Sequence, residues 1–396
     1  MKSADSKLLA RLDAALAATR DPIRTACLRA ERAGYRARQG HFDRARSELE
    51  ALRLQFSMRP HPEVSVWLCL LEAWIAYYGN LDRSALDRIK RAHAMSAAAR
   101  LEGLHALSAA WLAHLHLAYN EFDHAARMAA QALALAPPSL HTARARASLV
   151  VAQACHFAGR FDLAQPWYVE ARMHARADDD AQMLSAVLYN MASLQASHAM
   201  QAAVFGADHA DELVRQATAT VESTGNFDDL IGTASLGSLV PVMRASMASL
   251  RGDHALALSL YGEDFHSTAE QGLSRVLPAL FADRAWCRHR LGDADGARAD
   301  AAQALDRIDP STDDDDRALA HGRLAQVFEA LGDLPASQAH AALAKEALAR
   351  HQCQQARVLE AFAQVQLAGP PPAAIRTAPC SGAADTDPRP DRPVPR

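Results

Sequence analysis

Residues 120–133 read Asn-Glu-Phe-Asp-His-Ala-Ala-Arg-Met-Ala-Ala-Gln-Ala-Leu. The stretch begins with a turn-forming residue, places Asp123 where a carboxylate suits the first turn of a helix, and continues in small helix-forming residues. Equivalent turn positions recur along the chain at Gly40, Gly79, Asn120, Gly159, Gly206, Gly252, Gly292 and Gly332. They are spaced by 39, 41, 39, 47, 46, 40 and 40 residues. A self-similar period of this length predicts a solenoid of stacked helical pairs.

Each repeat contains apolar residues at helical spacing on both sides of its turn. Before Gly159 they include Leu149 and Ala152, and after it Phe161 and Ala164. The pattern predicts a helix A, a tight turn and a helix B in every repeat. Glycine supplies the left-handed conformation that ends helix A. The residues that follow three of these glycines, Asp253, Asp293 and Asp333, are expected to cap the next helix. Strand signals are almost absent.

The chain divides into three predicted parts. A capping helix lies at residues 3–19 within an N-terminal segment 1–20, and a solenoid spans 21–367. The solenoid comprises eight helical pairs up to about residue 350 and a final helix at 351–367. The tail, 368–396, carries eight prolines without an apolar period and is predicted to be disordered. The fifth and sixth repeats are expanded. The acidic runs 178–180 and 313–316 are expected to be solvated helix N-termini rather than metal sites.

Composition excludes several classes of protein. A formal net charge of −4 gives no basic footprint for nucleic acid. The N-terminus lacks the apolar region of a secretory signal, and no uncharged apolar run is long enough to span a membrane. Six widely separated cysteines do not form the framework of a small secreted domain. We therefore expect a cytoplasmic protein, and the Ala/Arg/Asp-rich composition suggests a GC-rich bacterial source.

The repeat resembles the tetratricopeptide repeat (TPR). Ala113, Ala125 and Ala132 stand where that family has small residues, and Phe122 and Pro137 stand where it has a large residue and its proline. The repeats near 159, 292 and 332 keep the same register. The period is near 40 residues, longer than the family's 34. In this respect the chain is similar to the TPR arrays of large bacterial regulators and signalling proteins. The resemblance implies an all-α fold, a right-handed α–α superhelix with its A helices on the concave side.

The resemblance also implies a groove for an extended peptide or a partner helix. Carrying over the family's groove positions gives candidate partner-binding residues on successive A helices: Trp111, His114, Gln153, His156, Asn190, Trp286, His289, Arg290, Arg323 and Gln326. Phe157 and Asp283 fall at further groove positions. The alternative for each is packing between repeats or a solvated helix face.

Other chemistry finds little support in the sequence. Some TPR proteins hold a C-terminal carboxylate in a Lys/Asn/Arg clamp, but here Asn190 and Arg323 lie three repeats apart and the lysines are missing. The pairs Cys287-x-His289 and His351-x-Cys353 have a spacing that sends their side chains to different helix faces, so no metal or other cofactor is expected. No hydrolase, phosphate-loop or dinucleotide motif is present.

The sequence therefore predicts a non-enzymatic scaffold that binds a protein or peptide in its concave groove, without nucleic acid or membrane. The alternative is a regulator that responds to a small molecule or signalling peptide and acts on a transcription or signalling partner. The irregular fifth and sixth repeats favour this alternative.

Overall fold

The computed structural model describes residues 6–232, 239–262, 275–310 and 312–369. These residues form seventeen α-helices and, within those ranges, no strand. The helices are α1 (Lys7–Ala18), α2 (Pro22–Arg38), α3 (Phe42–Gln55), α4 (Pro62–Asn80), α5 (Ser84–Ala98), α6 (Glu102–Ala118), α7 (Phe122–Leu135), α8 (His141–Phe157), α9 (Phe161–Ala177), α10 (Ala181–Val204), α11 (Ala210–Ile231), α12 (Leu239–Leu250), α13 (His254–Tyr261), α14 (Leu277–Arg290), α15 (Ala294–Arg307), α16 (Asp314–Ala330) and α17 (Leu334–Ala363).

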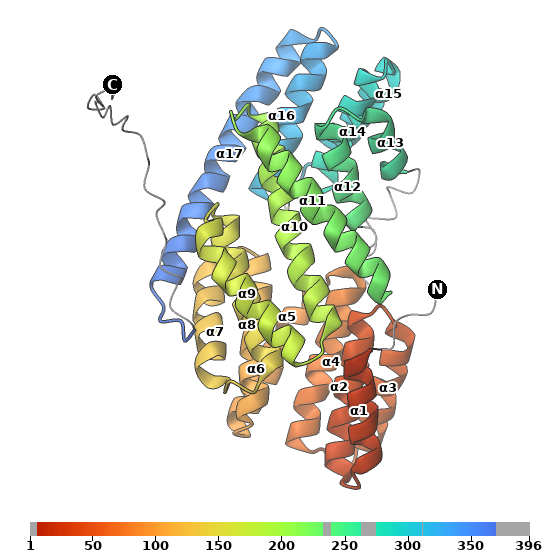
Figure 1. The fold of residues 1–396 in the computed structure, drawn as a ribbon, viewed down its shortest axis with the longest axis vertical. Helices are drawn as coiled ribbons and strands as arrows, with labels where there is room; N and C mark the ends of the chain where they lie inside the picture. Colours follow the sequence, from red (N-terminus) through yellow and green to blue (C-terminus); the bar gives the residue numbers. More distant parts are fainter. Residues whose placement is uncertain (1–5, 233–238, 263–274, 311, 370–396) are drawn as a thin grey trace, which may run out of the picture.

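The helices pair as the repeats predict. From α2/α3 to α16/α17, each even-numbered helix packs against the next helix along the chain, which gives eight pairs preceded by α1. Figure 1 shows the pairs winding into an α–α superhelix. The all-α class and the superhelical architecture are confirmed.

The turn residues adopt the predicted left-handed conformation in all but one repeat. Asn120 has a φ of 59°. Six of the glycines also have a positive φ: Gly40, Gly159, Gly206, Gly252, Gly292 and Gly332. The prediction for Gly79 was wrong. Gly79 lies inside α4, and Leu81, with a φ of 54°, ends that helix. The predicted caps at Asp253, Asp293 and Asp333 are confirmed, since each carboxylate accepts a backbone N–H from the first turn of the following helix.

The two long intervals, of 47 and 46 residues, meet at Gly206 in a long helical hairpin, the fifth pair. α10 contains 24 residues and α11 contains 22, and the two pack along each other. In the sixth pair, α12 and α13 are short, and segments 233–238 and 263–274 beside them lie outside the described residues. The expansion of the fifth pair is thus built into its helices.

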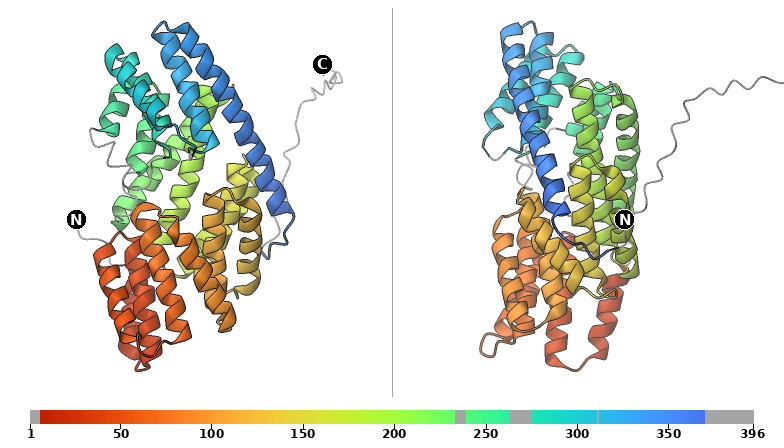
Figure 2. Two further views of the ribbon diagram at one scale, coloured as in Figure 1. Left: turned by 180° about the vertical axis from the view of Figure 1, so that it is seen from behind. Right: turned by 90° about the vertical axis from the view of Figure 1, so that its left-hand side faces the viewer.

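The predicted final helix at 351–367 is not a separate element. Residues 334–363 form one helix of 30 residues because no glycine or proline interrupts the sequence after Pro335. His340 in the first half of α17 stacks on His321 of α16, and Val358 and Phe362 in the second half belong to the buried cluster of α7 and α8. Figures 1 and 2 show this helix reaching from the last pair down to the middle of the molecule. Most of the predicted tail, residues 370–396, lies outside the described residues.

The core is made largely of alanine, which allows the helices to pack closely. The largest cluster of buried residues joins α6 to α10 and includes Val358 and Phe362 of α17. Ala109, Ala125 and Ala164 are fully buried in it. At the N-terminus, Leu8 and Leu12 of α1 pack against Leu28 and Tyr35 of α2, so α1 covers the first pair.

Candidate functional site: a track of cavities on the concave side

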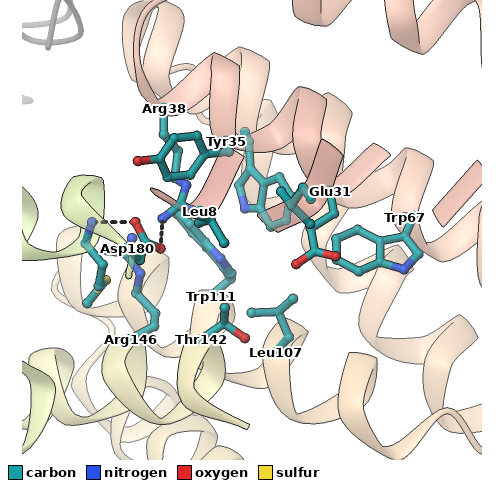
Figure 3. Close-up of a pocket in the computed structure, with 13 residues that line it drawn as sticks. Leu8, Glu31, Tyr35, Arg38, Trp67, Leu107, Trp111, Thr142, Arg146 and Asp180 are labelled. Carbon is teal, nitrogen blue, oxygen red and sulfur yellow. Dashed lines mark hydrogen bonds and ion pairs between the residues drawn. The ribbon is translucent and has the colours of Figure 1, made fainter. Parts of the chain in front are cut away.

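Three adjoining cavities run along the A helices on the inner side of the superhelix. The first cavity, of about 60 Å³, is lined by Leu8, Leu12, Glu31, Tyr35, Arg38, Trp67, Trp74, Leu107, Trp111, Thr142, Arg146, Asp180 and Met183 (Figure 3). The second, of about 80 Å³, shares Arg38 and Arg146 with the first. The third, the central cavity, measures about 270 Å³ and shares Tyr77, His114, Tyr189 and Asn190 with the second. We call the three together the concave track.

The lining of the central cavity combines aromatic and polar residues. Its lining residues are Tyr77, Leu81, His114, Leu117, Ala118, Asn120, Phe122, Gln153, Phe157, Tyr189, Asn190, Ser193, Leu194, Arg275, Val276, Asp313, Asp315 and Gln354. They come from repeats at both ends of the superhelix. A cavity that combines apolar surface with a few placed polar groups is typical of a ligand site.

Two amides from neighbouring repeats meet in this cavity. The Gln153 Nε2 group donates to Asn190 Oδ1 at 2.6 Å, and Asn190 Nδ2 donates to the carbonyl of Ala186 at 2.7 Å. Gln153 Oε1 is buried and accepts no hydrogen bond among the described residues. Leaving a buried acceptor unsatisfied is costly, so this oxygen is suited to receive an N–H group from a ligand.

Burial and positive charge keep His114 neutral. Its Nε2 lies 2.7 Å from the Tyr77 hydroxyl. Burial, and then the positive charge of Arg146, hold the pKa of His114 well below its ordinary value of 6.5. Burial also raises the pKa of Tyr77. This wall of the track is therefore a hydrogen-bonding surface without charge of its own.

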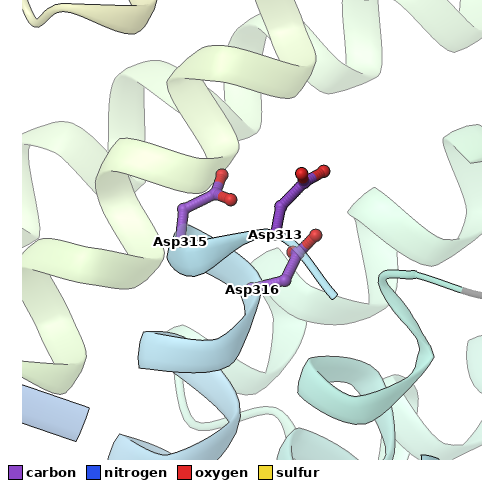
Figure 4. A group of neighbouring side chains, drawn as sticks. All are labelled: Asp313, Asp315 and Asp316. Atoms are coloured by element: carbon purple, nitrogen blue, oxygen red, sulfur yellow. The ribbon is translucent and has the colours of Figure 1, made fainter. Parts of the chain in front are cut away.

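The acidic run 313–316 faces inward, contrary to the expectation of a solvated helix end. Asp313 lies 3.3 Å from Arg275 and accepts from Asn120 Nδ2 at 3.1 Å. Oxygen atoms of Asp313, Asp315 and Asp316 lie within 4.8 Å of one another (Figure 4). Burial and the neighbouring carboxylates raise the pKa of Asp316 well above its ordinary value. The run thus closes one side of the central cavity.

The acidic run 178–180 is also a contact between repeats, not a solvated end. Asp180 is 3 % exposed and lies 2.7 Å from Arg38 of α2. Asp178 pairs with Arg11 of α1. These carboxylates join the first repeat to the turn between α9 and α10. The superhelix therefore returns on itself: the first repeat contacts the fifth here, and the Asn120–Asp313 hydrogen bond joins the third repeat to the eighth.

A fourth cavity, of about 610 Å³, lies at the C-terminal end of the superhelix and shares no lining residue with the other three. It is lined by Ala203, Ser249, Leu250, Gly252, His254, Trp286, Arg290, Arg323, Gln326, Glu329 and Ala330. Arg323 forms an ion pair with Asp283 at 2.9 Å, so its charge is balanced. The guanidinium groups of Arg290 and Arg323 lie 5.4 Å and 5.5 Å from the Trp286 ring.

The structure separates the predicted groove residues into two groups. Trp111, His114, Gln153 and Asn190 line the concave track, together with Phe157. Trp286, Arg290, Arg323 and Gln326 line the fourth cavity. Three predicted residues are in neither lining: His156 is buried against Tyr168, His289 lies beside Trp286, and Asp283 is buried in its ion pair with Arg323. Their contact with a partner stays a prediction.

Several lining residues were not predicted from the sequence. Trp67, Trp74 and Tyr77 lie on one helix at steps that repeat helical turns, and this aromatic series in α4 was an available signal. Arg146 also had a signal, since it is a charged residue that directly precedes the small and apolar stretch 147–152 of a helix A. Arg275, Gln354 and Asp180 had none, because they reach the track only when distant repeats meet.

The arrangement defines the class of protein as an all-helical repeat protein, and comparison with known structures agrees. The crystal structure of a Rap protein complexed with competence and sporulation factor superposes with a TM-score of 0.54 at 12 % identity, over 89 % of this chain and 92 % of that chain. A TPR-type repeat fold fits both chains. The sequence matches no known family model and no curated protein. No described helix combines the length and apolar character that crossing a bilayer requires.

Proposed function

We propose that this chain is a non-enzymatic, cytoplasmic bacterial repeat protein that binds a peptide, or an extended segment of a protein, in the concave track. The observation that carries the proposal is the central cavity, where Gln153 and Asn190 present amides beside an aromatic wall. Extended peptides carry backbone N–H and C=O groups at regular spacing, which side-chain amides can bind without charge. The bound factor in the Rap structure supports a peptide-sized ligand for this architecture.

The continuity of the track supports a ligand longer than a single residue. The first and second cavities share two lining residues, and the second and central cavities share four. Aromatic rings occur along it, including Trp74 and Trp111 with ring centroids 5.8 Å apart. Such rings supply apolar contact area that dominates the energetics of binding.

Capture from extract of the native cell tests the proposal. The chain is immobilised as wild type, as the double variant Gln153→Ala/Asn190→Ala, and as Gln216→Ala. Gln216 lies exposed on the outer helix α11 and serves as the matched control. The proposal predicts peptides or proteins that are recovered with the wild type and the control but lost with the double variant. Equal recovery with all three would contradict it.

A second function, a ligand-responsive regulator, is favoured by one observation. The walls of the central cavity come from both halves of the superhelix: α4 to α10 on one side, and Arg275, Asp313 and Gln354 on the other. A ligand that contacts both sides stabilises the closed arrangement by its differential affinity. A fraction of cell extract below peptide size that raises the melting temperature of the wild type, and not of the double variant, would favour this reading over a scaffold.

A further inference from the structure

Arg146 is a buried guanidinium group at the junction of the first and second cavities. Its residue is 3 % exposed, and it lies on α8 in the middle of the concave side. Its Nη2 donates to the Tyr78 hydroxyl at 3.2 Å, and its Cζ lies 4.2 Å from the centre of the Trp111 ring. Figure 3 shows the side chain in the cavity close to Asp180 and Trp111. The ring and the hydroxyl therefore hold the guanidinium in place.

The charge of Arg146 has no carboxylate partner within the described parts of the chain. The other buried arginine of the described residues, Arg323, is 7 % exposed and does have one, since it pairs with Asp283. Three acidic residues line the first two cavities: Asp180 pairs with Arg38, Asp228 accepts from the Ser185 hydroxyl, and Glu31 forms no ion pair with Arg146. A buried charge that lacks a counter-charge is unfavourable, and a buried arginine is normally paired.

The hydrogen-bonding capacity of Arg146 is also largely unused. A guanidinium group carries five N–H donors in a planar fork that matches a carboxylate. Among the described residues only the Tyr78 hydroxyl accepts from it. The remaining donors belong to a residue that lines two cavities of about 60 and 80 Å³. Since a water molecule takes up about 30 Å³ of liquid, either space holds a group of carboxylate size.

We propose that Arg146 binds a carboxylate group of the ligand, with Tyr78 and Trp111 as positioning residues that fix the orientation of its guanidinium. This inference rests on the proposed function, in which the ligand lies along the track, and it adds an acidic group at the end nearest the first repeat. The carboxylate is the C-terminus or an acidic side chain of a peptide, or it belongs to a small organic acid. The positive charge of Arg146 favours it, because the neighbouring His114 is neutral and Asp180 is already paired with Arg38.

Two sets of probes test this inference on the full chain at constant ionic strength. The first set compares succinate with its neutral analogue succinamide. The second compares a random tripeptide mixture that carries free C-terminal carboxylates with the same mixture amidated at the C-terminus. Binding is read from the fluorescence of the tryptophans and from the melting temperature. The variants are Arg146→Gln, Arg146→Lys and, as a matched control, Arg127→Gln at an exposed position of α7.

We expect the carboxylate member of at least one set to bind the wild type and Arg127→Gln more tightly than its neutral analogue. In Arg146→Gln this preference falls by about 10- to 100-fold, the usual effect of losing a hydrogen-bonded charge. Arg146→Lys keeps the positive charge but lacks the planar set of N–H donors, so we expect it to retain part of the preference. That intermediate result separates recognition of the carboxylate from a folding defect. Far-ultraviolet circular dichroism confirms that each variant is folded.

The outcomes distinguish this inference from the proposed function. Equal binding of the acid and amide peptides, together with no preference for succinate over succinamide that depends on Arg146, would overturn the carboxylate assignment and leave peptide binding intact. A preference that depends on Arg146 for succinate alone supports the carboxylate site, assigns it to a small acid and contradicts the peptide. The absence of any Arg146-dependent preference in both sets would overturn the inference.

Discussion

Arg38 and Asp180 are separated by 142 residues and form an ion pair of 2.7 Å in which the Asp180 side chain is 4 % exposed. The pair joins the first repeat to the fifth, and Asp180 also caps α10 by accepting from the backbone N–H of Met183. The closed shape of the superhelix thus depends on a contact that no local repeat pattern contains.

Removing Arg38 leaves Asp180 buried without its counter-charge. We expect Arg38→Ala to lower the free energy of unfolding by about 3 kcal/mol, because breaking a buried pair leaves an uncompensated charge. Arg46→Ala, which removes an exposed pair with Asp43, should cost less than about 1 kcal/mol. Urea denaturation measures both. Equal small losses for the two variants would show that the long-range pair does not stabilise the fold.

The second half of α17 is predicted to stabilise the molecule through its contact with α7 and α8. Phe362 is 7 % exposed within the largest buried cluster, so Phe362→Ala should lower the free energy of unfolding by about 3 kcal/mol. Leu343→Ala, at a 43 % exposed position in the first half of the helix, is the control and should change it little. Hydrogen exchange of the amides around residue 358 should accelerate in Phe362→Ala only. Unchanged exchange in that variant would contradict the docking of this half-helix.

Acidic pH should destabilise the fold through its buried histidines. Burial lowers the pKa of His156 to about 3 and those of His93 and His321 to about 4. Between pH 6.5 and these values the unfolded chain binds protons that the folded chain does not, so stability falls as the pH decreases. For one residue such as His156 the loss is about 2 kcal/mol at pH 5. Buried aspartates with a raised pKa, such as Asp316, act in the opposite direction.

Variants isolate the histidine contribution. The melting temperature of the wild type should fall more steeply from pH 7 to pH 5 than that of His156→Gln. His209→Gln, at an exposed position before α11, should follow the wild type. Identical slopes for all three proteins would refute the assignment of the acid sensitivity to buried His156.

Substitutions at two left-handed turn positions are predicted to change the stability of the protein in opposite directions. Arg100 is exposed with a φ of 56°, so Arg100→Gly should stabilise the protein by about 1 kcal/mol by relieving backbone strain. Gly252 has a φ of 82° and open space around its Cβ position, so Gly252→Ala should destabilise by about 1 kcal/mol through strain alone. Thermal unfolding of the two variants checks both signs, and a loss of stability in Arg100→Gly would be inconsistent with a strained turn.

The sequence predicts the local units well because their signals are local. Asn120 and the glycines mark turns by their backbone conformation, and Asp293 marks a helix start by its carboxylate. The prediction for Gly79 failed because a glycine is tolerated inside a helix, and Leu81, two residues later, adopts the left-handed conformation that ends α4. The division of α17 at residue 351 failed because the repeat period suggested a boundary that no helix-breaking residue enforces.

The candidate site was predicted only where it depends on the repeat register. Gln153 and Asn190 fall on the concave side because every helix A faces it, and they meet at 2.6 Å as neighbours in the stack. Asp180, Arg275 and Gln354 reach the track through the return of the superhelix on itself. That return depends on small rotations accumulated over eight pairs, which the local spacing of residues does not specify.

Photo-crosslinking from inside the central cavity tests the central claim most directly. A diazirine-bearing amino acid replaces Ser193, which lines the central cavity, and in a second protein replaces Gln216 on the outer face of α11. Both proteins are expressed and irradiated in the native cell. We predict that residue 193 crosslinks to a peptide or protein segment and that residue 216 does not, and that Gln153→Ala/Asn190→Ala abolishes the product from residue 193. A partner that crosslinks equally from both positions, or one that persists in the double variant, would contradict binding in the concave track.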